Sequence, residues 1–336
     1  MNIGARTFKT GIAVGLAVFI VHMLGLPYPA YAGVAAFLAV QPTVYRSYKT
    51  LLEQFLLNLL GASIALIALL LFGYNALTVG VVVMLLIAVN LRLGVSNMGI
   101  SVLTAIIVLE IQHEELLLFT GERVALIMIG ILSSLVINTL LFPPRYEKRL
   151  FQHLKTTSDH LSLLLRTETY HTLTHASYKK AVKTASENIE EAETLLELYG
   201  DEFLHKRKYT RAFLKKQITL LRFLALVKSE LELVKTLETF RSSIHQLTDE
   251  EKRCLQQSLY SLTSLDEQLF LCYEGDIPPS SLEALEKEGE EAHKVIRTLL
   301  LDKEKDAYIL LYASLAHLGK HLRKTKGALS SLHRST

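Results

Sequence analysis

Long uncharged runs, separated by short charged connections, dominate the first 144 residues. Four runs lack Lys, Arg, Asp and Glu, and they cover residues 10–45, 54–91, 93–109 and 124–144. A helix rises about 1.5 Å per residue and the hydrocarbon core of a bilayer is roughly 30 Å thick, so about 20 residues cross once. The first two runs are nearly twice that long, so each is expected to fold back on itself.

A turn signal lies near the middle of each long run. These signals are Pro27-Tyr28-Pro29 in the first run and Gly73-Tyr74-Asn75 in the second, and such residues end helices and favour turns. Two hairpins and one crossing from each shorter run predict six apolar helices, so residues 1–144 are expected to form an integral membrane six-helix bundle. The expected spans are Phe8–Leu24, Ala30–Tyr45, Leu51–Phe72, Ala76–Asn90, Val95–Ile111 and Glu122–Phe142.

The positive charges of this region alternate between its connections. Positive connections mark the cytoplasmic side of a membrane protein, and those of this chain contain Arg6, Lys9, Arg46, Lys49, Arg92, Arg145, Lys148 and Arg149. The opposite connections contain no Lys or Arg, and Arg123 at the mouth of the sixth span is the exception. Both termini are therefore expected in the cytoplasm. A cleaved signal peptide is disfavoured because apolar sequence resumes at once with Gly33-Val34-Ala35.

Residues 145–336 have helical periodicity of a different kind, with a single apolar stripe. The clearest stripe predicts a helix of about 40 residues, and it consists of Leu220, Leu224, Val227, Leu231, Val234, Leu237, Phe240, Ile244 and Leu247. Thr248 with Glu251, and Ser280 with Glu283, have the spacing of capping boxes that start new helices. We expect an antiparallel cytoplasmic bundle of about five or six helices.

Charge separates the two regions. Of 36 Lys and Arg and 33 Asp and Glu in 336 residues, the first 144 residues hold 6 and 5. The first region therefore suits lipid and the second suits water, although the average of 21% charged residues resembles a soluble protein. Two cysteines in the charged region suit a reducing compartment. A net charge of +3 without Trp makes a nucleic-acid partner unexpected.

Polar side chains within the apolar spans are the candidate functional residues, because buried polar groups in membranes mark solute pathways. A pathway for an organic anion is assigned to Gln41, Arg46, Asn90, Arg92, Asn97 and Asn138, and proton coupling to Glu110 and Glu53. Plainer roles stay open for some of them. Arg92 also fits a positive-inside anchor, Glu110 an interfacial cap, and Asn58 and Asn138 hydrogen bonds between helices.

No enzyme motif stands out, so neither catalysis nor a cofactor is expected. The glycines at Gly94 and Gly99 have the spacing of a phosphate loop, but Ile100-Ser101 replaces the required Lys-Ser/Thr. The pairs His171/His175 and His317/His321 could share a helix face, yet HExxH is absent, and solvated or capping histidines are the favoured interpretation. Six short spans seldom enclose a pathway alone, which favours a homodimer.

The order of motifs in the first region resembles the aromatic acid exporter family, which is related to fusaric acid resistance proteins. The matching segments are Arg6-Thr7-Phe8-Lys9-Thr10, the Pro27/Pro29 turn, Ala39-Val40-Gln41-Pro42-Thr43, Tyr45-Arg46-Ser47, Gly61, and Glu122-Arg123-Val124 through Asn138 to Arg145. The resemblance covers about residues 1–148. It implies an exporter of small aromatic or other organic acids in a bacterial plasma membrane, and Gln41, Arg46, Arg123 and Asn138 match its pattern.

Two functional hypotheses follow. The first is secondary efflux of organic acids without ATP, with the lipid bilayer and a small organic acid as partners. The second is a membrane-tethered regulator or scaffold that acts through residues 145–336, because this region is larger than the apolar one.

Overall fold

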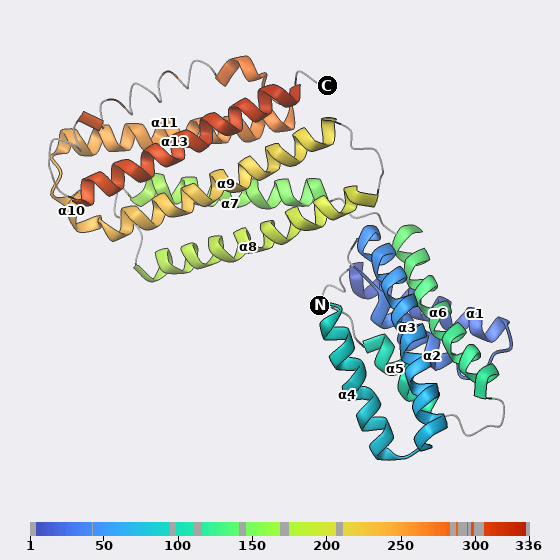
Figure 1. Cartoon of the computed structure of the whole chain (residues 1–336). Coiled ribbons are helices and arrows are strands. Elements are labelled where there is room, and N and C mark those ends of the chain that lie inside the picture. The colour runs from blue at the N-terminus through green and yellow to red at the C-terminus, as the bar shows by residue number, and fades with distance from the viewer. Residues whose placement is uncertain are drawn as a thin grey trace. The chain divides into compact units, whose positions relative to one another are not determined.

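The computed structural model describes residues 5–41, 43–94, 99–110, 116–140, 146–168, 175–205, 211–282, 287, 294, 297–298 and 306–333. All regular elements among these residues are helices, so the prediction of an all-α chain is confirmed (Figure 1). Contacts divide the chain into two compact units. The first unit comprises residues 1–144 and 201–205, and the second comprises residues 145–200 and 206–336.

Six helices are described in the first unit. They are α1 (Ala5–Met23), α2 (Pro29–Ala39), α3 (Val44–Phe72), α4 (Ala76–Arg92), α5 (Gly99–Leu109) and α6 (Leu116–Leu140). The breaks after α1 and α3 contain the two predicted turns, and Asn75 caps α4 by accepting a hydrogen bond from the Thr78 N–H at 2.8 Å.

The second helix is shorter than the sequence predicts. It ends at Ala39 instead of residue 45, because Val40 is already extended and Pro42 follows. Proline lacks an N–H and pushes the residue before it out of the helical region. A new helix, α3, then begins at Val44, where Thr43 Oγ1 accepts a hydrogen bond from the Arg46 N–H at 3.1 Å.

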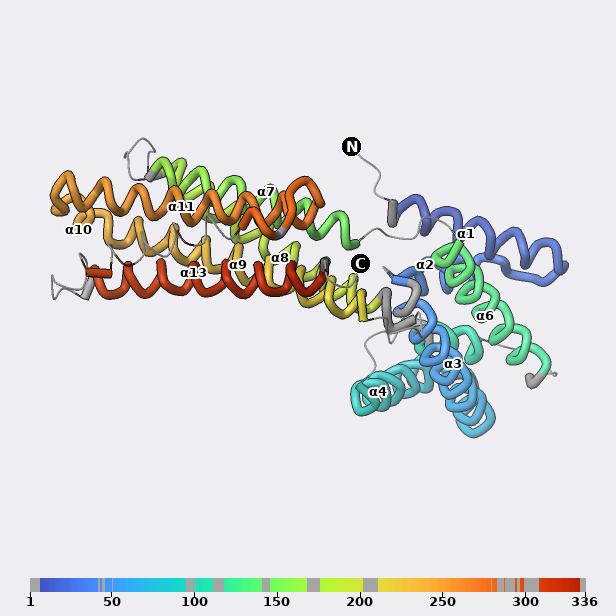
Figure 2. Tube along the Cα trace, turned by 90° about the horizontal axis from the view of Figure 1, so that it is seen from above, coloured from blue at the N-terminus to red at the C-terminus, as the bar shows by residue number. Residues whose placement is uncertain are grey.

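Small residues bring the helices of the first unit close together. A Cβ at Gly130 of α6 would lie 2.3 Å from the carbonyl oxygen of Ala32 in α2, and a Cβ at Gly61 of α3 would lie 2.6 Å from that of Ser101 in α5. Such close backbone approach is typical of helices that associate in lipid. The helices α1 and α4 lie at opposite edges of the unit in both views (Figures 1 and 2).

Large apolar side chains cover the outside of this unit. Leu77, Phe72 and Met84 are 77%, 70% and 67% exposed. Within the described ranges, two helices, Arg46–Phe72 and Leu118–Leu140, are long and apolar enough to cross a bilayer. Thr7–Met23, Pro29–Ala39 and Ala76–Arg92 are apolar but shorter.

The second unit is a bundle of amphipathic helices. Its elements are α7 (Tyr146–Glu168), α8 (His175–His205, whose last five residues group with the first unit), α9 (Arg211–Thr239), α10 (Arg241–His245), α11 (Asp249–Glu274), the 3₁₀ turn η1 (Pro279–Ser281) and α13 (Asp306–His333). The helices α9 and α13 run side by side in both views (Figures 1 and 2). Phe151, Phe223 and Phe270 pack ring to ring in the core.

The apolar stripe from Leu220 to Leu247 points into this core, but it does not lie on one continuous helix. The helix α9 ends at Thr239, Phe240 leaves the helical conformation, and the short helix α10 continues the stripe. The predicted 40-residue helix is therefore wrong, although eight of its nine stripe residues are buried. The capping box of Thr248 and Glu251 is confirmed at the start of α11, and Glu283 lies outside the described residues.

Candidate functional site: buried polar groups in the apolar unit

Asn138 is the centre of a buried polar network that joins three helix ends. Its side-chain amide donates to Ser47 Oγ at 2.7 Å and to the Thr43 carbonyl at 3.1 Å, and its Oδ1 accepts from Lys9 Nζ at 3.2 Å. All four residues are buried. The network holds the C-terminal end of α6 against the N-terminal ends of α1 and α3, so Asn138 has the structural role of joining helices.

A second polar group lies on α3, α4 and α5. Thr104 donates to Asn58 Oδ1, and Asn90 Nδ2 donates to Ser101 Oγ at 2.7 Å. These four side chains are completely buried. Asn58 Nδ2 and Asn90 Oδ1 have no hydrogen-bond partner in the described part of the chain.

Gln54 lies one helical turn before Asn58 on α3 and is 1% exposed. Neither its Nε2 nor its Oε1 has a partner among the described residues. An unsatisfied buried polar group costs about 1–3 kcal/mol, and such groups are rare unless water or a ligand meets them. Gln54 and Asn58 therefore form the strongest candidate for contact with a polar solute.

The other predicted site residues lie apart from this group. Gln41 is half-buried between α2 and α3, and Arg46 is half-buried in the first turn of α3. Arg92 is exposed in the last turn of α4, and Glu110 is exposed just after α5. Glu53 pairs with Lys49 at 3.6 Å. Asn97 lies outside the described residues.

The structure thus separates the predicted set, since Asn90 belongs to the polar group of α3, α4 and α5 and Asn138 to the network at the helix ends. The sequence-based prediction does not include Gln54, because this residue is the first of the uncharged run 54–91 and carries no charge itself. The available signal was the spacing of Gln54 and Asn58, which places two amides on one helix face.

A buried acidic pair lies in the second unit. Ser158 Oγ of α7 lies 2.9 Å from Glu230 Oε2 of α9 and 2.5 Å from Asp266 Oδ2 of α11. All three residues are at most 2% exposed. A serine hydroxyl has one proton and can donate to only one carboxylate, so the other carboxyl must be protonated to complete this arrangement.

Burial raises the pKa of Glu230 well above its ordinary value, and the negative charge of Asp266 raises it further. Burial also raises the pKa of Asp266 from 3.8 to about 7, although the hydrogen bond from Ser158 acts in the opposite direction. Both shifts have the cause expected for carboxyls in an apolar core. The pair therefore stores a proton near neutral pH.

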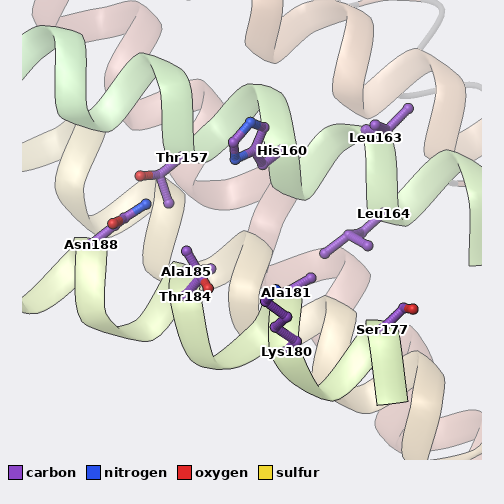
Figure 3. A pocket seen from close by; sticks show the side chains of 10 residues that line it. All are labelled: Thr157, His160, Leu163, Leu164, Ser177, Lys180, Ala181, Thr184, Ala185 and Asn188. Atoms are coloured by element: carbon purple, nitrogen blue, oxygen red, sulfur yellow. The ribbon is translucent and has the colours of Figure 1, made fainter. Parts of the chain in front are cut away.

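A cavity of about 320 Å³ opens between α7 and α8. Figure 3 shows Thr157 and His160 on α7 above Lys180, Thr184 and Asn188 on α8. Its walls also include Leu163, Leu164, Ala181 and Ala185, so the cavity is a mainly apolar groove.

The histidine pair of α13 has no third metal ligand in the part of the chain that the structure describes. His317 and His321 approach each other to 3.3 Å, and burial, together with His317, lowers the pKa of His321. Among the described residues, no group of three His, Cys, Asp or Glu could hold a metal ion. His171 lies outside these residues.

The first unit matches a known family. Residues 1–141 match the family model described as aromatic acid exporter family member 1. The resemblance that the sequence suggested is therefore confirmed over this region. An exporter family implies a membrane protein, which agrees with the apolar exterior of the unit.

The relatives extend the likeness beyond residue 141. UPF0421 protein YgaE of Bacillus subtilis (strain 168) is 28% identical over 280 residues, which cover 83% of this chain and 79% of the relative. A UPF0421 protein of Staphylococcus aureus (strain USA300) is 27% identical over 225 residues, 65% of this chain and 68% of its own. A UPF0421 protein of Oceanobacillus iheyensis is 29% identical over 149 residues, and the match spans 43% of its length. These names state no substrate.

Proposed function

We propose that the protein is a secondary exporter of small aromatic or other organic acids, and not an enzyme. The observation that carries this proposal is the inverted polarity of the first unit, in which Gln54 and Asn58 are buried while Phe72 and Leu77 face outward. An apolar exterior suits lipid, and an interior with unsatisfied amides suits a polar solute. The family match over residues 1–141 supports the same conclusion.

The proposal includes six crossings, with both termini in the cytoplasm of a bacterial cell. The helices α2 and α5 have 11 residues and α4 has 17, which is shorter than the hydrocarbon core requires. Protein or water would therefore surround the ends of these helices. Two copies of the chain would assemble as a homodimer around a shared or paired pathway.

Efflux of aromatic acids tests this proposal. Cells that express the chain and cells without it are loaded with benzoate, cinnamate and the neutral control benzamide, and retention is followed at several pH values. We expect the chain to accelerate loss of at least one carboxylate and to leave benzamide unchanged. Identical retention of all the acids would contradict the exporter.

The alternative is a membrane-tethered regulator, and the groove between α7 and α8 is the observation that favours it. Deletion of residues 149–336 separates the two functions. An exporter keeps some flux or ligand binding in the first unit, because that unit has apolar clusters of its own. A regulator loses its partners and shows no solute phenotype.

A further inference from the structure

Arg123 of α6 is a buried cation in the apolar unit. The residue is 8% exposed, and no ion pair of the described residues includes it. Glu122 precedes it on the helix, and adjacent helical residues do not face each other. A guanidinium stays charged in proteins, so its burial without a counterion is costly unless an anion joins it.

Two tyrosine rings contact this cation. The guanidinium carbon lies 4.1 Å from the ring centre of Tyr28 and 5.2 Å from that of Tyr31. These cation–π contacts contribute up to about 2 kcal/mol when water is excluded. Tyr28 is held there by a left-handed backbone with φ 60°, which is unusual for a residue other than glycine.

The guanidinium still has a nitrogen that can donate a hydrogen bond. Arg123 Nη1 is buried and has no hydrogen-bond partner among the described residues. Carboxylates accept hydrogen bonds from the N–H groups of a guanidinium, and Nη1 of Arg123 donates none among the described residues. Ring contacts and a carboxylate can therefore occupy Arg123 at the same time.

We propose that Arg123, with Tyr28 and Tyr31, binds the carboxylate of an aromatic acid. Tyr28 is 54% exposed, so its ring also offers a surface on which an aromatic solute can stack at the entrance to the site. Arg123 precedes Asn138 by 15 residues on α6, a distance of about 22 Å along the helix axis. The site is therefore separate from the network of Lys9 and Asn138. This inference rests on the proposed export of organic acids.

Equilibrium binding of radiolabelled benzoate tests the site. The full chain is purified in a maltoside detergent, which contains no phosphate, and wild type is compared with Arg123→Gln and Arg123→Lys. Benzamide is the neutral probe, and Arg149→Gln is the matched control because Arg149 is an exposed arginine of the second unit. We expect Arg123→Gln to weaken benzoate binding on the order of tenfold or more, the effect of losing a charged hydrogen bond.

Arg123→Lys is expected to weaken benzoate binding severalfold, because an ammonium keeps the charge but not the planar fork. If Arg123→Gln fails to fold, the benzoate affinity of Arg123→Lys still tests the site. Benzamide binding should not change in either variant, and Arg149→Gln should bind benzoate like wild type. Unchanged benzoate affinity in the Arg123 variants, no benzoate binding by wild type, or an equal loss for benzamide would each overturn the inference.

Lipid phosphate is the competing anion. Phosphatidylglycerol that stays bound to wild type in native mass spectrometry, is lost in Arg123→Gln and is not displaced by benzoate would overturn the inference. Cellular efflux separates this inference from the proposed function. Wild-type benzoate efflux that survives in both Arg123 variants would refute only the site, whereas absent wild-type efflux with Arg123-dependent binding would refute only the exporter.

Discussion

At the scale of single residues, the polar side chains of the first unit divide into satisfied and unsatisfied groups. Asn138 and its partners form hydrogen bonds that connect helices. Gln54 forms none among the described residues, although it is equally buried. A buried polar side chain whose hydrogen bonds are formed stabilises the fold, and this accounts for its presence. A buried polar side chain without hydrogen bonds lowers the stability, which indicates a function. Apolar substitutions in the two groups should therefore have opposite effects on the stability of the protein.

Gln54→Leu should raise or preserve stability and reduce transport. Leucine removes a buried amide without a partner among the described residues, a cost of about 1–3 kcal/mol in the native protein. A lost solute hydrogen bond of about 1 kcal/mol would lower efflux roughly fivefold. The measurements are the thermal unfolding midpoint in detergent and the initial rate of acid efflux. Asn138→Leu is the control, which should unfold at a lower temperature, and normal efflux by Gln54→Leu would exclude its contact with solute.

The acidic pair of Glu230 and Asp266 makes the second unit sensitive to pH. The pKa values of both carboxyls are raised in the folded protein. The stability that depends on their bound protons is therefore complete below pH about 4. It is lost as the pH rises through the raised pKa of each carboxyl, which is about 7 for Asp266. Each pKa unit corresponds to about 1.4 kcal/mol. Hydrogen exchange in α9 and α11, corrected for the intrinsic rate, should show falling protection between pH 5 and pH 8.

Glu230→Gln should flatten this dependence, because a glutamine resembles the protonated acid and cannot ionise. The matched control is Glu187→Gln, which removes an exposed carboxylate of α8 that pairs with Lys183. A protection profile of Glu230→Gln that keeps the wild-type slope would show that the pair does not titrate in this range.

At the scale of helices, small residues determine how closely the elements of the first unit approach. Gly130→Ala should destabilise the protein by about 1–3 kcal/mol, the usual cost of overpacking, because its Cβ would lie 2.3 Å from a backbone oxygen of α2. Gly121→Ala on the same helix is the control, since a Cβ there meets nothing within 4 Å. Thermal unfolding of the full chain checks both, and equal midpoints would contradict the close packing of α2 and α6.

Element positions could largely be predicted from the sequence, and helix ends less well. The turns at Pro27-Tyr28-Pro29 and Gly73-Tyr74-Asn75 were readable because proline and glycine act locally. The early end of α2 was not predicted because the uncharged run continues to Tyr45, although Pro42 was a local signal. The break after Thr239 was not predicted because the apolar stripe continues through it into α10. The candidate site was harder still, since hydrogen-bond satisfaction of Gln54 or Arg123 depends on neighbours from other helices.

At the scale of the whole molecule, the two units are suited to different solvents. Exposed side chains of α3 and α4 are large and apolar, whereas those of the second unit include many ion pairs such as Lys216 with Glu147 and Lys228 with Glu193. The proposed topology assigns the turn between α3 and α4 to the outside of the cell and the start of α3 to the cytoplasm.

Cysteine labelling checks that topology. In a chain whose Cys254 and Cys272 are replaced by alanine, Tyr74→Cys should react with a membrane-impermeant maleimide on intact cells, because Tyr74 is exposed in the turn before α4. Tyr48→Cys, near the start of α3, should react only after the cells are permeabilised. Labelling of Tyr48→Cys on intact cells would show that the start of α3 faces the outside, which contradicts the proposed topology.

The most direct measurement of the central claim is efflux of benzoate from loaded cells, with benzamide as the neutral control. The account predicts faster benzoate loss with the wild-type chain, a reduced rate with Gln54→Leu, and no effect on benzamide. Equal benzoate retention with and without the chain, extended to the other aromatic acids at several pH values, would contradict it.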